Sequence, residues 1–210
     1  MTGAVPLPAS ATPPVDRLAE LLAESTTALS RDARSAARLA AEATALATAA
    51  ADIGARARAR YLEGRAAELA LDESGALAAY REALAGFQAV GDDAGRADAL
   101  RGIGQVYDRL GDAPQALAHH LRALALAEEA GDVRSQAASM RTIGVVHSRA
   151  GHPDQGLDWY RRSLALPGVG ADPVERARTL NAIGINLKNL GRLDESLETL
   201  EAALAAFRAA

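Results

Sequence analysis

The sequence predicts an all-α protein built as an elongated array of helical hairpins, and three observations carry this prediction. Hydrophobic residues make up 49% of the 210 residues, and most of them are Ala and Leu, which are strong helix formers. Aromatic residues are only 3% of the chain, and the residues that favour strands are sparse. Several series of identical residues recur with a period of 40. A period of roughly 20–50 residues is typical of arrays whose units stack on their neighbours.

The period is visible in residues of different chemistry. One series consists of glycines and another of aspartates, and several Leu and Ala positions follow the same spacing. The two clearest series are Gly64, Gly104, Gly144 and Gly184, and Asp52, Asp92, Asp132 and Asp172. Independent series that share one period indicate four copies of one structural unit.

Each unit is predicted to contain two helices. Apolar residues recur at helical spacing between Asp93 and Leu110, which gives one apolar face. Gly111 then supplies the left-handed residue that ends a helix, and Asp112 can cap the next helix, with Pro114 in its first turn. We therefore predict about ten helices. The segments are a disordered 1–14, a degenerate Ala-rich capping hairpin at 15–50, and repeats at 51–90, 91–130, 131–170 and 171–210.

The unit resembles the tetratricopeptide repeat, and the second copy matches the motif best. The matching residues are Leu100, Ile103, Gly104, Tyr107, Leu110, Gly111, Asp112, Ala116 and Ala123. The 40-residue form is similar to repeats of kinesin light chains and Pins-type adaptors, and to N-terminal regions of bacterial signalling proteins. The resemblance implies a right-handed superhelix with a concave groove that binds peptides or protein domains. In the first copy Glu63 falls on a position expected to be buried, which a one-residue shift of that helix would accommodate.

The resemblance also implies which residues line the groove, because the family's inward positions lie at fixed offsets from the repeated glycine. Transferred to this sequence, twenty such positions carry eight basic and three acidic residues. We therefore expect a basic groove on an acidic protein, although these arginines could equally well be solvated helix surface. The candidate binding residues are Arg58, Tyr61, Arg65, Arg101, Gln105, Arg109, Arg141, Arg149, Arg178, Asn181 and Lys188.

No catalytic, metal or cofactor site is expected. The chain has no cysteine, and its only lysine is Lys188, so neither a cysteine-ligated zinc site nor a phosphate-binding loop with its lysine can form. The pair Gly102 and Gly104 is predicted to lie mid-helix rather than after a strand, which argues against a dinucleotide site. His120 and His147 fall on positions that usually pack inside hairpins.

Charge and hydropathy argue against nucleic-acid binding and against a membrane span. The net charge of −4 gives no general attraction to nucleic acid. No segment has the eighteen or so apolar residues of a membrane span, and a cytoplasmic location is expected. Arginine makes up nearly all of the basic residues, which is typical of a high-GC bacterial genome.

We therefore predict a protein-interaction scaffold, without enzymatic activity, that belongs to a bacterial signalling protein. Its expected partner is a protein or peptide that presents acidic groups or a free C-terminal carboxylate. The alternative is a sensor or dimerisation module of a larger enzyme, such as a diguanylate cyclase or sensor kinase, lying C-terminal to this segment. Homodimerisation through the last helix is also open. In that helix the residues expected to face inward are Leu193, Leu197, Leu200, Leu204 and Phe207.

Overall fold

The computed structural model describes residues 14–209, and within this range the chain forms ten α-helices and no strand. Residues 1–13, for which disorder is predicted, lie outside the described residues, and Pro14 is the first residue of α1. The helices are α1 (Pro14–Ala28), α2 (Ala33–Ala49), α3 (Ile53–Leu69), α4 (Glu73–Val90), α5 (Asp93–Arg109), α6 (Ala113–Glu129), α7 (Val133–Arg149), α8 (Pro153–Ala165), α9 (Pro173–Asn189) and α10 (Leu193–Arg208).

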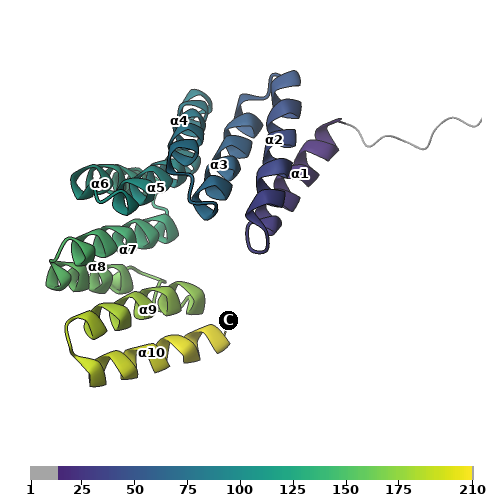
Figure 1. Cartoon of the computed structure of the whole chain (residues 1–210). Helices are drawn as coiled ribbons and strands as arrows, with labels where there is room; N and C mark the ends of the chain where they lie inside the picture. The colour runs from purple at the N-terminus through teal and green to yellow at the C-terminus, as the bar shows by residue number, and fades with distance from the viewer. Residues whose placement is uncertain (1–13, 210) are drawn as a thin grey trace, which may run out of the picture.

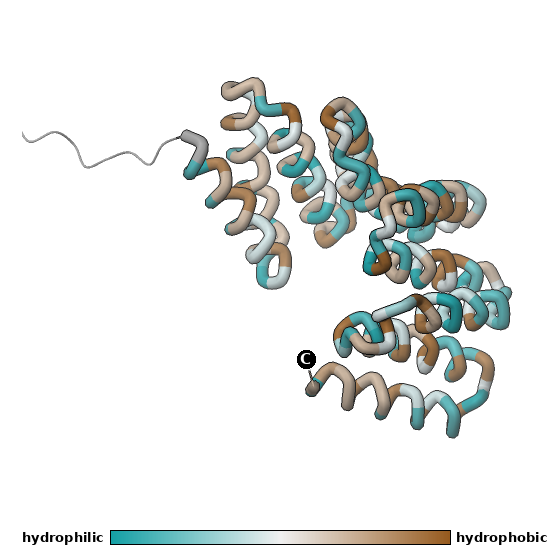
Figure 2. The backbone as a smooth tube through the Cα atoms, turned by 180° about the vertical axis from the view of Figure 1, so that it is seen from behind, coloured by the Kyte–Doolittle hydropathy of each residue, from teal (hydrophilic) through white to brown (hydrophobic). Residues whose placement is uncertain are grey.

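Consecutive helices pair as antiparallel hairpins, and the five hairpins stack one after another along a curved path (Figure 1). The hairpin α1/α2 lies at one end of the stack and α9/α10 at the other, with α5/α6 near the bend. Hydrophilic and hydrophobic residues alternate along the helices (Figure 2). Among the described residues, no helix has both the length and the apolar character needed to cross a membrane. The all-α array of five hairpins is confirmed.

Aspartate side chains start most of the helices. At the N-termini of α2 to α7 and of α9, an aspartate carboxylate accepts a hydrogen bond from a backbone N–H in the first turn. Such caps satisfy backbone donors that have no partner inside the helix. The exceptions are α8, preceded by His152, and α10, preceded by Arg192, neither of which makes a side-chain cap.

The loops between helices use left-handed residues, as predicted. Gly111 has a φ angle of 77°, and the glycines at 91, 131, 151 and 191 adopt the same conformation. Ala51 and Leu71 stand at equivalent places with φ angles of 55° and 59°. A side chain with a Cβ atom is strained in this region.

The repeated glycine lets the two helices of a hairpin approach closely. A Cβ atom built on Gly64 would lie 2.6 Å from the Tyr80 ring, and one on Gly184 would lie 2.6 Å from Leu200. Small residues in the second helix serve the same purpose, since Ala76 and Ala83 are fully buried. These residues therefore hold each hairpin together.

Helix α3 keeps the register of the other first helices. It begins at Ile53 and has 17 residues, like α5, α7 and α9, so the predicted one-residue shift is wrong. Glu63 instead stays in place because its carboxylate accepts hydrogen bonds of 2.6 Å from Thr44 and 2.7 Å from Arg60. Two polar neighbours thus make a half-buried carboxylate tolerable.

Leucines of the second helices pack against the following unit. Leu77 contacts the buried cluster that includes Ile103 and Val106, and Leu124 is buried with Met140 and Ile143. The array therefore has a continuous core that runs from hairpin to hairpin, as expected for stacked repeats.

The last helix shows the consequence of this arrangement. Leu197 and Leu204, which are equivalent to Leu77 and Leu84, have exposed fractions of 60% and 50%. Helix α10 packs on α9 through small residues, including the buried Ser196 and Ala203. Leu200 packs against Gly184 of α9 as predicted. The prediction that Leu193, Leu197, Leu204 and Phe207 face inward is wrong, because those positions serve contact with a following unit rather than with the hairpin partner.

Candidate functional site: the concave face

The first helices of the five hairpins lie next to one another. Contacts join α1 to α3, α3 to α5, α5 to α7 and α7 to α9. Two depressions lie on this surface, one between α1, α3 and α5 and the other between α5 and α7. We refer to the surface formed by these first helices as the concave face.

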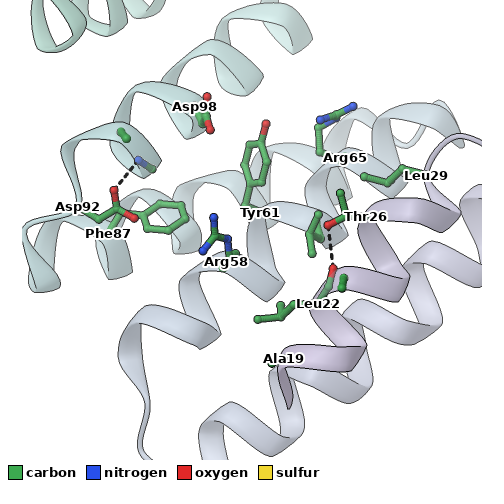
Figure 3. A pocket seen from close by; sticks show the side chains of 14 residues that line it. Ala19, Leu22, Thr26, Leu29, Arg58, Tyr61, Arg65, Phe87, Asp92 and Asp98 are labelled. Atoms are coloured by element: carbon green, nitrogen blue, oxygen red, sulfur yellow. Dashed lines mark hydrogen bonds between the residues drawn. The ribbon is translucent and has the colours of Figure 1, made fainter. Parts of the chain in front are cut away.

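The depression between α1, α3 and α5, here the α1–α3–α5 pocket, has a volume of about 560 Å³. Helix α3 places Arg58, Tyr61 and Arg65 on one face, because these residues are three to four positions apart. Figure 3 shows these three side chains reaching into the same space. Leu22 and Phe87 contribute apolar surface to the lining.

The charged side chains of this pocket differ in whether they already have a partner within the chain. The Asp92 carboxylate already accepts the backbone N–H of Gly95 at 2.8 Å, and Asp98 is paired with Arg101. In contrast, Arg58 and Arg65 are exposed and form no ion pair with any residue in the described range. The pocket therefore offers two arginines without carboxylate partners beside an apolar surface.

The pocket also perturbs the groups in its wall. Burial raises the pKa of Tyr61, and the nearby Asp98 carboxylate raises it further. Partial burial likewise raises the pKa of Asp98, although Arg101 and Arg65 oppose this effect. The raised pKa keeps Tyr61 a neutral phenol near pH 7, so its hydroxyl can take part in hydrogen bonds.

The second depression lies between α5 and α7 and has a volume of about 230 Å³. It brings together Gln105, Arg109 and Arg149 from the predicted set. Both arginines are engaged within the chain, since Arg109 pairs with Glu68 at 2.5 Å and Arg149 pairs with Asp108 at 2.5 Å. Of the predicted residues here, only Gln105 has no side-chain hydrogen bond among the described residues.

Three further predicted arginines also bind carboxylates of the chain. Arg101 pairs with Asp98, and Arg141 donates to Glu175 at 2.6 Å. Arg178 reaches the other oxygen of Glu175 at 2.8 Å. The Arg141 and Glu175 side chains are only 15% and 3% exposed, so this pair belongs to the interior rather than to an open groove.

Asn181 and Lys188 lie exposed on α9 and line neither depression. The predicted residues thus do not form one site, and only Arg58, Tyr61 and Arg65 of this set lie together in the α1–α3–α5 pocket. Five of the eight groove cations neutralise carboxylates of the same chain. The concave face is therefore less basic than the residue count predicts.

Two features of the site were missed from the sequence. Glu175 is not among the predicted site residues, although its position three residues before Arg178 indicates an ion pair on one helix face. The wall supplied by the first hairpin, which includes Leu22 and Thr26 of α1 and Leu29 of the turn that follows, carries no recognisable motif, because that hairpin lacks the repeat pattern.

The histidines differ in their surroundings. His120 is buried against Gly104, as predicted, whereas His147 is only partly buried. Within the described range, no group of three or more His, Asp or Glu side chains is arranged to hold a metal ion. Gly102 and Gly104 lie in the middle of α5, where no dinucleotide-binding turn can form.

Comparison with known proteins identifies the repeat family and solved structures of similar fold. The tetratricopeptide repeat family matches the sequence over residues 64–129 and again over 95–167. A comparison with curated proteins finds no match. Among solved structures, BtubC (BKLC) from P. vanneervenii is similar, with a TM-score of 0.67, 16% identity, and coverage of 95% of this chain and 92% of that one.

Two Rap proteins are also similar in fold. The Rap conjugation gene regulator of the plasmid pLS20, in complex with the Phr* peptide, gives a TM-score of 0.80 at 15% identity, covering 93% of this chain and 54% of that one. A Rap protein complexed with Competence and Sporulation Factor gives a TM-score of 0.74 at 15% identity, with coverage of 94% of this chain and 64% of that one. Because the family match agrees with the repeated glycines and the stacked hairpins, the chain belongs to the tetratricopeptide repeat family.

Proposed function

We propose that this protein is an interaction scaffold that binds a peptide segment of a partner on its concave face, in the α1–α3–α5 pocket. The observation that carries the proposal is the combination of a pocket of about 560 Å³ with two arginines, Arg58 and Arg65, that form no ion pair with a described carboxylate. Two solved structures of the same fold contain a bound peptide or factor, which supports a binding role for such an array.

The chemistry of the pocket favours a particular kind of segment. Arg58 and Arg65 can each hold a carboxylate through two parallel hydrogen bonds. Leu22, Leu29 and Phe87 can cover an apolar side chain next to that carboxylate. The proposed ligand therefore carries an acidic side chain or a free C-terminal carboxylate beside an apolar residue.

The wider role that we propose is regulation within bacterial signalling, and one of the similar structures is described as a gene regulator. The alternative is an input module that passes peptide binding on to an attached enzyme. In both cases the array performs binding and carries out no chemical step of its own.

The proposal is tested by selecting peptides from a displayed random library and measuring affinity by calorimetry. Arg58→Ala combined with Arg65→Ala is expected to weaken binding at least tenfold, which corresponds to about 1.4 kcal/mol. Affinity for the unaltered chain should fall as salt is raised from low to physiological concentration. The matched control is Arg56→Ala, since Arg56 is an exposed arginine of the same helix about 200° around its axis from Arg58. Selected peptides that bind independently of both arginines and of salt would refute the proposal.

A second proposal concerns α10, whose exposed residues suit another copy of the same helix. Leu193, Leu197, Leu204 and Phe207 have exposed fractions between 46% and 63% and lie along one stripe. If two copies of α10 run antiparallel, Leu193 faces Phe207 of the second copy, and Leu197 faces Leu204. The same arrangement brings Asp194 near Arg208, so the charges at the edge are complementary. We therefore propose a homodimer through α10.

Sedimentation over a range of concentrations tests this dimer. Leu197→Glu with Leu204→Glu should shift the chain to monomer, whereas Leu121→Glu, at a leucine of α6 that is 47% exposed, should not. Because the chain has no cysteine, a mixture of Leu197→Cys and Leu204→Cys chains should form a mixed disulfide more readily than either variant alone. A chain that remains monomeric at the highest concentration would contradict the proposal.

A further inference from the structure

One position in the repeat differs between neighbouring units in a way that opens a cleft. His120 stands where Tyr80 and Tyr160 stand in the units on either side. In all three units the ring lies on the repeated glycine, since a Cβ on Gly104 would meet the His120 ring at 2.6 Å and one on Gly144 would meet Tyr160 at 2.5 Å. The histidine is therefore a shorter side chain in a place that otherwise holds a phenol.

In the two tyrosine units the phenol reaches a polar residue of the first helix. The Tyr80 hydroxyl donates a hydrogen bond to Glu68, and the Tyr160 hydroxyl lies within hydrogen-bonding reach of Ser148. The equivalent residue in the middle unit is Asp108. No hydrogen bond joins His120 to Asp108 in the described part of the chain. Instead, both residues line the depression of about 230 Å³ between α5 and α7, here the His120 cleft.

The polar groups of the cleft are incompletely satisfied. His120 is 1% exposed, and its Nδ1 atom has no hydrogen-bond partner among the described residues. Burial lowers the pKa of His120 to about 4, so the imidazole is neutral at pH 7. Asp108 is 10% exposed and accepts one hydrogen bond from Arg149 through Oδ2, while Oδ1 accepts none from the described side chains.

The walls suit a flat ring that carries a hydrogen-bond donor. Val145 and Thr142 line the α7 side of the cleft, and Gln105 and Arg109 line the α5 side. Arginine planes pack well on aromatic faces, and the inner end offers a carboxylate oxygen that can accept from a hydroxyl. A charged ammonium is less suitable, since Arg109 and Arg149 lie at the same cleft.

We propose that the His120 cleft binds a phenol, namely a tyrosine side chain of the peptide held on the concave face. The hydroxyl of the ligand donates to Asp108, as the Tyr80 hydroxyl donates to Glu68 within its own unit. The ligand thus supplies the group that the second unit lacks. This inference rests on the proposed peptide binding and adds the class of side chain that the peptide presents.

The probe for this cleft is p-cresol, which reproduces the tyrosine side chain, and the control is toluene, which is p-cresol without the hydroxyl. In NMR titrations, p-cresol is expected to shift the His120 imidazole and Val145 methyl signals saturably, with toluene at least threefold weaker. Asp108→Leu should remove the preference for p-cresol over toluene, because it removes the acceptor.

The variant His120→Tyr gives the decisive comparison. It restores the residue found in the neighbouring units, so it should fold, and its own phenol should close the cleft and abolish the p-cresol shift at Val145. If the His120 signal of the unaltered chain stays constant up to the solubility limit of p-cresol, or if the Val145 shift survives in His120→Tyr, the inference is wrong. These titrations involve no peptide, so their outcome is separate from that of the Arg58 and Arg65 variants.

Discussion

The phenol ring of Tyr80 lies directly against Gly102 of the following hairpin, so that a Cβ atom on Gly102 would come within 2.6 Å of the ring. The same ring also packs against Gly64 of its own hairpin, where an added Cβ atom would lie 2.6 Å from a ring carbon. Tyr80 is fully buried. One side chain therefore joins its own hairpin to the next, and neither glycine can gain a methyl group without moving that ring.

Replacing Gly102 by alanine should destabilise the array. Overpacking of a buried contact costs about 1–3 kcal/mol, which outweighs the gain of roughly 1 kcal/mol in helix propensity at most such sites. We expect a net loss of up to about 2 kcal/mol in the free energy of unfolding, measured with urea. In Gly54→Ala, where the nearest atom to a new Cβ is 3.6 Å away, no loss is expected. An equal response at both positions would contradict the contact argument.

The buried ion pair between Arg141 and Glu175 should make Arg141 a stability residue. Removing one partner of a buried pair costs about 3–5 kcal/mol, and Arg178 keeps part of the compensation for Glu175. Arg141→Ala is expected to lower the free energy of unfolding by about 3 kcal/mol. Arg178→Ala should lower the free energy of unfolding by less than about 1 kcal/mol, because the Arg178 side chain is 54% exposed. Thermal and urea unfolding of both variants would show whether this difference exists.

His120 should make the stability depend on pH. Its folded pKa is about 4, below the value of about 6.5 expected in the unfolded chain. The unfolded state therefore binds the proton first, so stability is complete above pH 6.5 and falls as the pH drops from 6.5 towards 4. A shift of this size corresponds to a loss of about 3 kcal/mol across that window.

The matched variant for this prediction is His120→Tyr, which cannot take up the proton. Urea unfolding at several values between pH 7.5 and pH 4.5 should give a steeper decline for the unaltered chain than for the variant. Parallel declines would show that His120 is not the group responsible.

Leu71 should be improved by glycine. The residue has a φ angle of 59° and its side chain is 72% exposed, so glycine removes strain and loses little packing. A side chain in this conformation costs about 1–2 kcal/mol relative to glycine, and the greater freedom of glycine in the unfolded chain offsets part of the gain. We expect Leu71→Gly to raise the melting temperature. The reverse change, Gly111→Ala at a φ angle of 77° with open space around it, should lower it.

The sequence was sufficient for the fold because the period and the helix ends depend on local chemistry. Asp112 caps α6 and Gly111 ends the preceding helix through interactions with residues a few positions away. The array was equally predictable because each unit meets only its neighbours.

The candidate site was less predictable because it depends on contacts between units. The partners Arg141 and Glu175 are 34 residues apart, and Arg149 and Asp108 are 41 apart. The positions expected from the family motif put Arg141 on the first helix of its unit. They could not show that Arg141 would form a buried ion pair with a carboxylate of the next unit. The exposed leucines of α10 were mistaken for hairpin core, because helical spacing shows a common face without showing which neighbour covers it.

Helix α8 gives the array an uneven junction. It ends at Ala165 after 13 residues, whereas α6 has 17, which shortens the second helix by about 6 Å. Polar bonds then span the junction to the last hairpin, including Arg141 to Glu175 and Asn186 to the carbonyl of Pro153 at 2.9 Å. Separation at this point would expose the apolar cluster that Leu157 and Tyr160 form with Leu187, but less surface than complete unfolding exposes, so its dependence on urea should be shallower than that of global unfolding. In hydrogen exchange, α9 and α10 would thus behave as one cooperative unit that opens before the rest of the protein unfolds.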